Sequence, residues 1–401
     1  MKHITLYLQL IILICASCDI KKNKEATPTG FLKIYNEDSY SNQYIPLDIE
    51  QTTDGGFLIL SSTKISTSSF PGIYLMKIDK DGKLLSAKSL SEDYVSAVPN
   101  LLKNGNDYYI VCMGQQDLST YILHVSESAE ITQSGLMSNV RYPLSAEFDL
   151  ASSQIILQHY NKYDLQTNVS RVSVTGTVAK TRYFSIGSGG FDVEQPIIDH
   201  LTGKGKKYPF LSGQLSGNTY YFNGFYNYTL SLCMFDYNWD IEDDPAAAQG
   251  YRDERCISSI FSLGGNKIAT SRYAYANNYI IPSATVPTIS GSFIANSDMG
   301  GFLIPELAND APMCLKAIQK NGQSILLYAS TTKSGQVALY AYDAASGGLL
   351  GSQYLGSTNP YTMASVIQTS DEGIAVLATT QVAGRFPRIA VFKLAKEELE
   401  W

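Results

Sequence analysis

Apolar and polar residues alternate in short runs along most of the chain, and turn residues separate the runs. The clearest stretch has four such runs, at residues 47–52, 57–60, 73–78 and 84–89, with Asp54-Gly55-Gly56 and Asp81-Gly82 between two pairs of them. Alternation with a period of two is typical of half-buried strands. Asp-Gly between such runs favours the positive-φ turn of a β-hairpin. The pattern therefore predicts a four-stranded antiparallel unit.

The end of the third run and the turn after it recur through the sequence. The matching positions are Ile78-Asp79, Val125-Ser126, Val172-Ser173, Phe235-Asp236, Ala295-Asn296, Tyr342-Asp343 and Leu394-Ala395. Units of about 50 residues with four strands each are typical of β-propeller blades. We therefore expect an all-β fold, a seven-bladed β-propeller of four-stranded blades over residues 31–401.

The last repeat offers three runs, at residues 363–368, 374–379 and 388–394, and lacks a fourth. An extra run at residues 31–36 precedes the first repeat and looks like the fourth run of other units. We expect this N-terminal strand to complete the last blade, which would remove open sheet edges. A β-sandwich array and a β-solenoid are the alternatives for this spacing. The degenerate repeat resembles the kelch-like class of propellers, and this resemblance implies no particular function.

The amino terminus has the pattern of an export signal. Lys2 precedes an apolar run at residues 4–14, which is too short to span a bilayer. Ala16-Ser17-Cys18 resembles the lipobox of Bacteroidota lipoproteins, although Cys15 stands where leucine is usual. The resemblance implies a signal peptide at residues 1–17, a lipid on Cys18, a tether at residues 18–30 and anchorage in a bilayer, expected to be the outer membrane. The alternative is an ordinary cleaved signal.

Composition agrees with a folded β protein outside the nucleic-acid-binding classes. Hydrophobic residues make up 44% of the chain and charged residues 17%, with 28 tyrosines and 31 glycines. This balance supports a large core and favours strands and turns. The formal net charge is −7. Because a nucleic-acid partner requires a basic footprint, we expect none.

Three insertions interrupt the repeat, at residues 185–208, 240–255 and 273–290, and we expect them to share one face of the propeller. Functional residues often lie in such loops. The third insertion carries the candidate ligand-binding residues, and tyrosine rings with amide groups suit sugars or extended peptides. The alternative is that these tyrosines, like the aromatic cluster at residues 220–228, are packing residues. The five candidates are Tyr273, Tyr275, Tyr279, Asn277 and Asn278.

Catalytic signals are weak. His200 beside Asp199 is the best acid/base candidate, and a polar surface role is the alternative. The histidines do not share a metal-ligand spacing, and the acidic run at residues 240–244 lacks the calcium-loop pattern. We therefore predict no metal and no cofactor. The cysteines beyond the leader are expected to be buried free thiols, with disulfides as the alternative made possible by export. They are Cys112, Cys233, Cys256 and Cys314.

These observations favour a membrane-anchored, non-enzymatic binding or scaffolding propeller at the bacterial cell envelope. It would engage a glycan or an envelope protein through its loop-rich face. One alternative is a carbohydrate-active lyase or hydrolase whose site lies at the central channel, with His200 and carboxylates converging there. A second alternative is a structural subunit of an envelope complex, which predicts an apolar patch on the outer edge or the opposite face.

Overall fold

A computed structural model describes residues 30–35, 43–66, 68–149, 152–187, 192–382 and 386–401. The predicted signal peptide, Cys18 and nearly all of the tether lie outside these residues. Within them the structure is built from strands, with one α-helix, α2 (Glu194–Thr202), and two short 3₁₀ helices, η1 (Asn296–Met299) and η2 (Lys396–Glu398). The described part contains no helix of the length and apolarity needed to cross a bilayer.

The strands form antiparallel four-stranded units that follow one another along the chain. Unit one contains β2 (Tyr44–Gln51), β3 (Phe57–Thr63), β4 (Gly72–Ile78) and β5 (Leu84–Ser89). Unit two contains β7 (Leu102–Asn104), β8 (Asp107–Gly114), β9 (Ser119–Val125) and β10 (Ile131–Arg141), and β6 (Tyr94–Val95) links it to unit one. Unit three contains β11 (Pro143–Asp149), β12 (Gln154–Asn161), β13 (Gln166–Val172) and β14 (Val178–Ser185).

Units four to six continue this order. Unit four contains β15 (Leu211–Ser216), β16 (Thr219–Tyr226), β17 (Thr229–Asp236) and β18 (Ala246–Gln249). Unit five contains β19 (Arg255–Gly264), β20 (Lys267–Ala274), β21 (Asn277–Thr285) and β23 (Phe302–Leu303). Unit six contains β24 (Cys314–Lys320), β25 (Gln323–Thr331), β26 (Val337–Asp343) and β27 (Leu349–Leu355).

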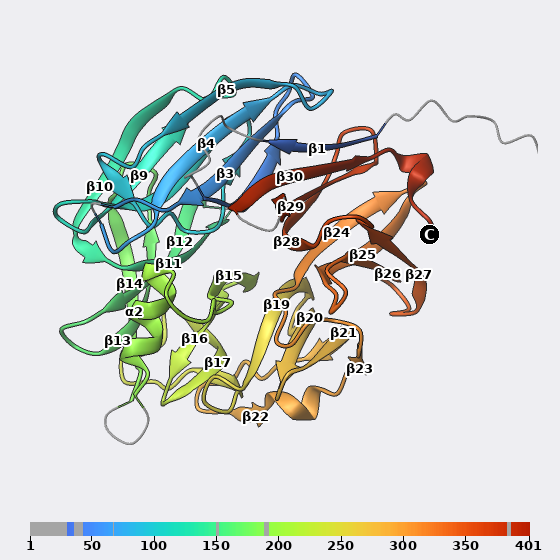
Figure 1. The fold of residues 1–401 in the computed structure, drawn as a ribbon. Coiled ribbons are helices and arrows are strands. Elements are labelled where there is room, and N and C mark those ends of the chain that lie inside the picture. The colour runs from blue at the N-terminus through green and yellow to red at the C-terminus, as the bar shows by residue number, and fades with distance from the viewer. Residues whose placement is uncertain (1–29, 36–42, 67, 150–151, 188–191, 383–385) are drawn as a thin grey trace, which may run out of the picture.

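Unit seven combines the two ends of the chain. It contains β28 (Tyr361–Gln368), β29 (Ile374–Val382), β30 (Phe386–Leu394) and the N-terminal strand β1 (Phe31–Tyr35). β1 pairs antiparallel with β30, with Lys33 opposite Val391. Figure 1 shows the two strands side by side, β1 in blue and β30 in red. The pairing leaves β30 covered on both sides.

A separate apolar core fills the space between each unit and the next. The core between units one and two includes Leu60 and Ile110, and the one between units five and six includes Ile280 and Leu326. The same packing joins unit seven to unit one, where Ile389 lies in one cluster with side chains of β3 and β4. The first strands of the units lie nearest one another, as β2 does to β28 and β11 to β15. The units are thus arranged around an axis lined by first strands (Figure 1).

Unit five differs from the sequence prediction. Its third strand was expected to end near Ala295, but β21 is the third strand, and residues 293–295 form β22 (Phe293–Ala295), which pairs parallel with β18 of unit four. The prediction of a long loop at residues 273–290 is therefore wrong. β20 and β21 are joined by a tight turn at Tyr275 and Ala276, both with positive φ. Such a turn usually carries glycine or asparagine, and their absence concealed it.

Candidate ligand-binding face

The five residues proposed for ligand binding lie on one hairpin, β20–β21, in which Tyr273 is directly opposite Asn278. Tyr273 is 2% exposed, and its hydroxyl donates to the backbone oxygen of Asp253 at 3.2 Å. Asn278 is buried, and its amide donates to the backbone oxygen of Ala308 at 2.7 Å. Both side chains are already engaged within the protein. Their arrangement supports the packing alternative for these two residues.

The other three candidates lie at or beside the β20–β21 turn. Tyr275 is 56% exposed, and the Asn277 amide donates to its backbone oxygen at 3.3 Å. The ring of Tyr279 lies beneath the guanidinium of Arg272, 4.0 Å from the ring centroid. The five candidates therefore differ in exposure: Tyr275 and Asn277 are exposed, Tyr279 is half-buried, and the other two are buried. The aromatic cluster of unit four is likewise core, since Phe222 and Phe225 are completely buried.

His200 and Asp199 lie at the end of α2 without forming an acid–base pair. The Asp199 carboxylate accepts a hydrogen bond from the Gln195 amide at 2.8 Å. The Nδ1 atom of His200 accepts the backbone N–H of Tyr208 at 2.9 Å. Burial, together with the nearby charge of Lys207, lowers the pKa of His200 to about 3. A neutral imidazole with one nitrogen occupied by a backbone donor suits a structural role better than proton transfer.

A pocket of about 270 Å³ lies where the first strands of all the units converge. We call it the axial pocket. Each unit contributes at or beside the start of its first strand, with Pro46, Pro99, Pro143, Pro209, Ser258, Pro312 and Met363 in chain order. Ends of second strands also line it, including Ser62 of β3 and Thr379 of β29. The axial pocket therefore opens on the face that carries the unit-to-unit connections, here called the loop-rich face.

The predicted insertion at residues 185–208 forms one wall of the axial pocket. Helix α2 is fixed by Ile197 and Leu201, which are buried in an apolar cluster with residues of units three to five. His200, Leu201, Lys207 and Tyr208 then line the pocket. The insertion predicted at 240–255 is divided between two places. At its start, the guanidinium of Arg182 donates to the backbone oxygens of Trp239 and Asp243 at 2.8 and 2.9 Å, whereas at its end Asp253 accepts a hydrogen bond from the hydroxyl of Tyr208 at 3.0 Å. The acidic run at residues 240–244 is therefore a loop that is held in place by hydrogen bonds from Arg182.

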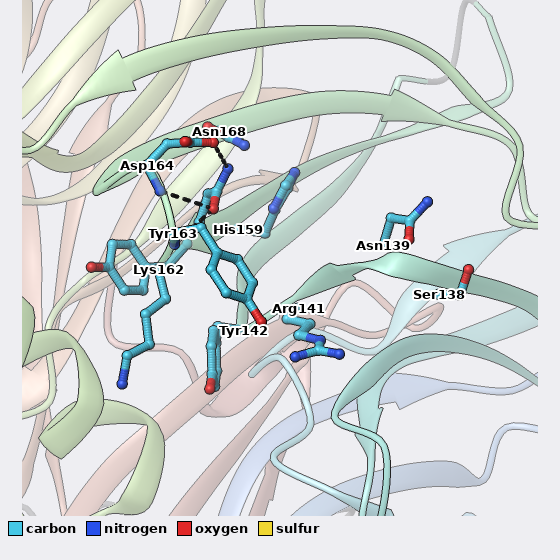
Figure 2. Close-up of a pocket in the computed structure, with 11 residues that line it drawn as sticks. Ser138, Asn139, Arg141, Tyr142, His159, Lys162, Tyr163, Asp164 and Asn168 are labelled. Atoms are coloured by element: carbon cyan, nitrogen blue, oxygen red, sulfur yellow. Dashed lines mark hydrogen bonds between the residues drawn. The ribbon is translucent and has the colours of Figure 1, made fainter.

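A larger cleft of about 740 Å³ lies on the same face at the boundary of units two and three (Figure 2). We call it the rim cleft. It is lined by residues at the end of β10, at the end of β12 and in the β12–β13 turn, namely Ser138, Asn139, Arg141, Tyr142, His159, Tyr160, Asn161, Lys162, Tyr163, Asp164 and Asn168. The turn between second and third strands lies on the loop-rich face. Polar and aromatic groups alternate around this cleft.

The segment Tyr142-Pro143-Leu144 separates the two depressions. Tyr142 lines the rim cleft, whereas Pro143 and Leu144 line the axial pocket. The chain turns sharply here, since Tyr142 has a φ of 54°. Tyr142 also lies near Tyr160, with ring centroids 6.3 Å apart. One narrow ridge therefore divides the loop-rich face into two neighbouring hollows, a form that suits an extended ligand.

Below the axial pocket, four charged side chains of the first strands gather around the axis. Asp48 of β2 accepts the backbone N–H of Leu101 at 2.8 Å and the hydroxyl of Ser365 at 2.7 Å. Glu50, Glu147 and Lys316 complete this channel cluster. Water reaches Glu147 and Lys316, although both lie deep among protein atoms. The four groups therefore line a wet interior rather than a dry core.

The charges in the channel cluster are unequal, with three carboxyl groups around one ammonium group. Burial raises the pKa of Asp48 and of Glu147, and in both cases the charge of Lys316 opposes the rise. Burial and the nearby Asp48 raise the pKa of Glu50 to about 7. Burial lowers the pKa of Lys316, but the neighbouring thiol and carboxyl groups outweigh it and raise the pKa overall. Lys316 is thus a fixed cation, unsuited to act as a base.

Glu50→Gln is expected to raise the free energy of unfolding at pH 8 by about 3 kcal/mol. The pKa of Glu50 rises from 4.5 to about 7 on folding, so the folded protein binds more protons in that interval. Wild-type stability therefore falls as the pH rises through it, whereas the amide variant lacks this fall. Urea unfolding at pH 5 and pH 8 measures the difference. Identical pH dependence in the two proteins would contradict the channel assignment.

Metal and thiol chemistry find little support in the described residues. No group of three or more histidine, cysteine or acidic residues there is placed to hold a metal ion. All four cysteines within this part are free thiols; Cys112, Cys233 and Cys256 are buried and Cys314 is partly buried. The prediction of free thiols is confirmed. Cys256 and Cys314 lie on first strands of successive units, as the sequence indicated.

Comparisons with known proteins identify the fold. No family model matches the chain, and no curated protein sequence matches it. Among solved structures, it is similar to an oligogalacturonate lyase in complex with manganese, with a TM-score of 0.50 and 11% identity over 92% of this chain and 97% of that one. It is also similar to the β-propeller domain of the Trilobed protease from Pyrococcus furiosus, with a TM-score of 0.44 and 10% identity over 88% of this chain and 98% of that one.

A third similar structure is the Pyrococcus horikoshii acylaminoacyl peptidase, with a TM-score of 0.45 and 9% identity over 86% of this chain and 50% of that one. At such identities a structural likeness shows the fold alone. The chain is an all-β protein of the β-propeller class.

Proposed function

We propose that the protein is a non-enzymatic binding propeller that holds a glycan across its loop-rich face. One observation carries the proposal: the axial pocket and the rim cleft lie on one face, and the continuous segment Tyr142-Pro143-Leu144 borders both. A ligand longer than one sugar can occupy both hollows by crossing this ridge. Exposed tyrosine rings with amide and hydroxyl groups offer both stacking surfaces and hydrogen bonds. A rigid all-β scaffold fixes their spacing.

We also propose the finer architecture, a closed propeller of seven four-stranded blades in which the N-terminal strand completes the last. Two observations support it: the pairing of β1 with β30 and the shared core of units seven and one. Closure matters for function because the axial pocket draws residues from every unit. A shift of one blade would displace its contribution to the pocket.

The cellular setting is part of the same proposal. The leader resembles that of a Bacteroidota lipoprotein, so Cys18 would carry the lipid and anchor a kelch-like propeller to the outer membrane. β1 begins at Phe31, only about a dozen residues beyond that cysteine, and at most ~3.5 Å per residue this tether keeps the propeller close to the bilayer. A glycan at the envelope is a ligand within its reach.

Thr362→Trp is expected to weaken glycan binding at least tenfold, about 1.4 kcal/mol. Thr362 is exposed on β28 and lines the axial pocket, so an indole there fills space that the ligand would use. The matched control is Thr132→Trp, because Thr132 is exposed on β10 and is not among the lining residues of either hollow. The detergent-purified full chain is first tested on a glycan array, and affinity is then measured by titration calorimetry. Equal losses in both variants would contradict the proposal.

An enzyme of carbohydrate chemistry is the second candidate, and the channel cluster favours it over His200. A carboxyl group with a pKa near 7, such as that of Glu50, can act as a general acid. The similar structures include a lyase and a peptidase, but they show the fold alone. Cleavage of the bound glycan by the wild type, abolished in Glu50→Gln, would establish this candidate. Binding without cleavage is the expected result.

A structural role in an envelope complex rests on a different surface. Apolar side chains are exposed on the outer strands of units five and six, with Phe302 58%, Leu303 50% and Leu349 58% exposed. None of these three side chains lines either hollow, so a partner there would leave both hollows open. Glycan binding and assembly are therefore compatible, and the binding assay separates them.

A further inference from the structure

We infer that the rim cleft selects a negatively charged sugar, a uronate residue of the bound glycan. The inference rests on the proposed function and adds the chemical class of the ligand. It depends on three features of the cleft: cations without counter-ions, a buried acceptor without a donor, and exposed aromatic rings. Each is a property of residues at one boundary, that of units two and three.

The first feature is unbalanced positive charge. Arg141 and Lys162 both line the rim cleft, and neither forms an ion pair with any residue that the structure describes. Lys206, on the same face, is by contrast paired with Asp310 at 2.8 Å. In a protein with a formal net charge of −7, two unpaired cations in one hollow form a local positive field.

The acidic residue of the cleft does not neutralise this field directly. The Asp164 carboxylate accepts a hydrogen bond from the Asn161 amide at 2.8 Å, and the other end of Asn161 accepts the backbone N–H of Tyr163 at 3.0 Å. Asp164 therefore helps to shape the β12–β13 turn. A guanidinium left free in a cleft suits a carboxylate, because the two planar groups can form paired hydrogen bonds.

The second feature is an orphaned acceptor. Asn168 is 4% exposed and lines the cleft, and its side-chain oxygen has no hydrogen-bond partner. A buried polar atom without a partner costs roughly 1–3 kcal/mol. A sugar hydroxyl is a donor that can satisfy this oxygen. Nearby, burial lowers the pKa of His159 to about 4, so its imidazole adds no repulsive or attractive charge at neutral pH.

The third feature is aromatic surface. Tyr163 is 85% exposed at the tip of the β12–β13 turn, and Tyr142 lines the ridge toward the axial pocket. In Figure 2 the Tyr163 side chain extends toward Arg141 and Tyr142. Rings in this position present flat apolar faces to the C–H face of a sugar. Ring, acceptor and cation together match a sugar that carries a carboxylate.

The test compares free and esterified uronates, which differ in charge but little in shape. Hexamers of galacturonate, mannuronate and glucuronate, each with its methyl ester, are titrated into the full chain. At least one free acid is expected to bind ten or more times tighter than its ester. Arg141→Gln should lose at least tenfold in affinity for the acid and little for the ester. Raising the salt concentration should weaken binding of the acid alone.

Controls separate the possible outcomes. Lys180→Gln removes the same charge from an exposed site on β14, where Lys180 bonds Asn238, and should leave affinity within twofold. Equal binding of acid and ester, or binding of neutral glycans only, would overturn the inference while leaving the proposed function intact. Failure of every glycan to bind would overturn both. Loss of acid binding in Arg141→Gln with unchanged melting temperature supports the inference.

Discussion

Deletion of residues 31–35 is expected to lower the free energy of unfolding by about 5 kcal/mol or more and to cause aggregation. These five residues form β1, which pairs with β30 along its whole length. Ile34 packs against the core between units six and seven, and Phe31 packs against the core between units seven and one. The Tyr35 hydroxyl also donates to the backbone oxygen of Gly82 at 2.8 Å. Without β1, β30 becomes an open apolar edge.

Thermal unfolding and size-exclusion chromatography measure this result. Two point variants sharpen it, because both change β1 without shortening the chain. Ile34→Asp places a carboxylate against the core and should be strongly destabilising, whereas Lys33→Ser changes an exposed position and should be within about 0.5 kcal/mol of the wild type. A deletion variant that remains monomeric and as stable as the wild type would show that β1 does not close the fold.

Lys316→Met is expected to destabilise the protein at pH 8 by about 1–2 kcal/mol, because it removes the positive charge that opposes the raised pKa of Asp48 and of Glu147 in a cluster that water reaches. Glu50 has Lys103 at 3.8 Å as a second positive neighbour, but Asp48 and Glu147 have no ion pair with described residues. Carboxyl groups whose pKa is raised on folding bind extra protons in the folded state. Acid therefore stabilises the variant as the pH falls through the raised pKa values toward the ordinary ones.

The expected signature is a loss of stability at pH 8 that is smaller at pH 5. Urea unfolding at both pH values measures it, and the double variant with Glu50→Gln should recover part of the loss at pH 8. If Lys316→Met lost the same stability at both pH values, its role would be packing of its aliphatic chain.

Most of the fold could be predicted because its turns carry recognisable residues. An Asp-Gly turn precedes β3 and another precedes β5, and the predicted run at residues 84–89 coincides with β5. The prediction for unit five was wrong because its turn has no recognisable residue: Tyr275 and Ala276 both have positive φ, and neither is glycine. β18 was also unmarked, because Ala246–Gln249 is short and shows no alternation.

The two hollows of the loop-rich face were less predictable, because their lining residues come from segments that are far apart in the sequence. The insertion at residues 185–208 was located, and it does line the axial pocket. The rim cleft is formed by the end of β10 and the β12–β13 turn together. Neither segment has a sequence pattern that indicates a binding site by itself. Lys316 follows the apolar Leu315 as any strand lysine would. The packing of first strands against one another brings its ammonium group near three carboxyl groups that lie far from it in the sequence.

A crystal structure of the full chain with the glycan that it retains tests the binding face most directly. We expect a sugar chain that crosses Tyr142, with one end in the axial pocket and a charged unit beside Arg141. Density for the glycan at the opposite mouth of the channel, beside Lys103 and Gln368, would contradict it.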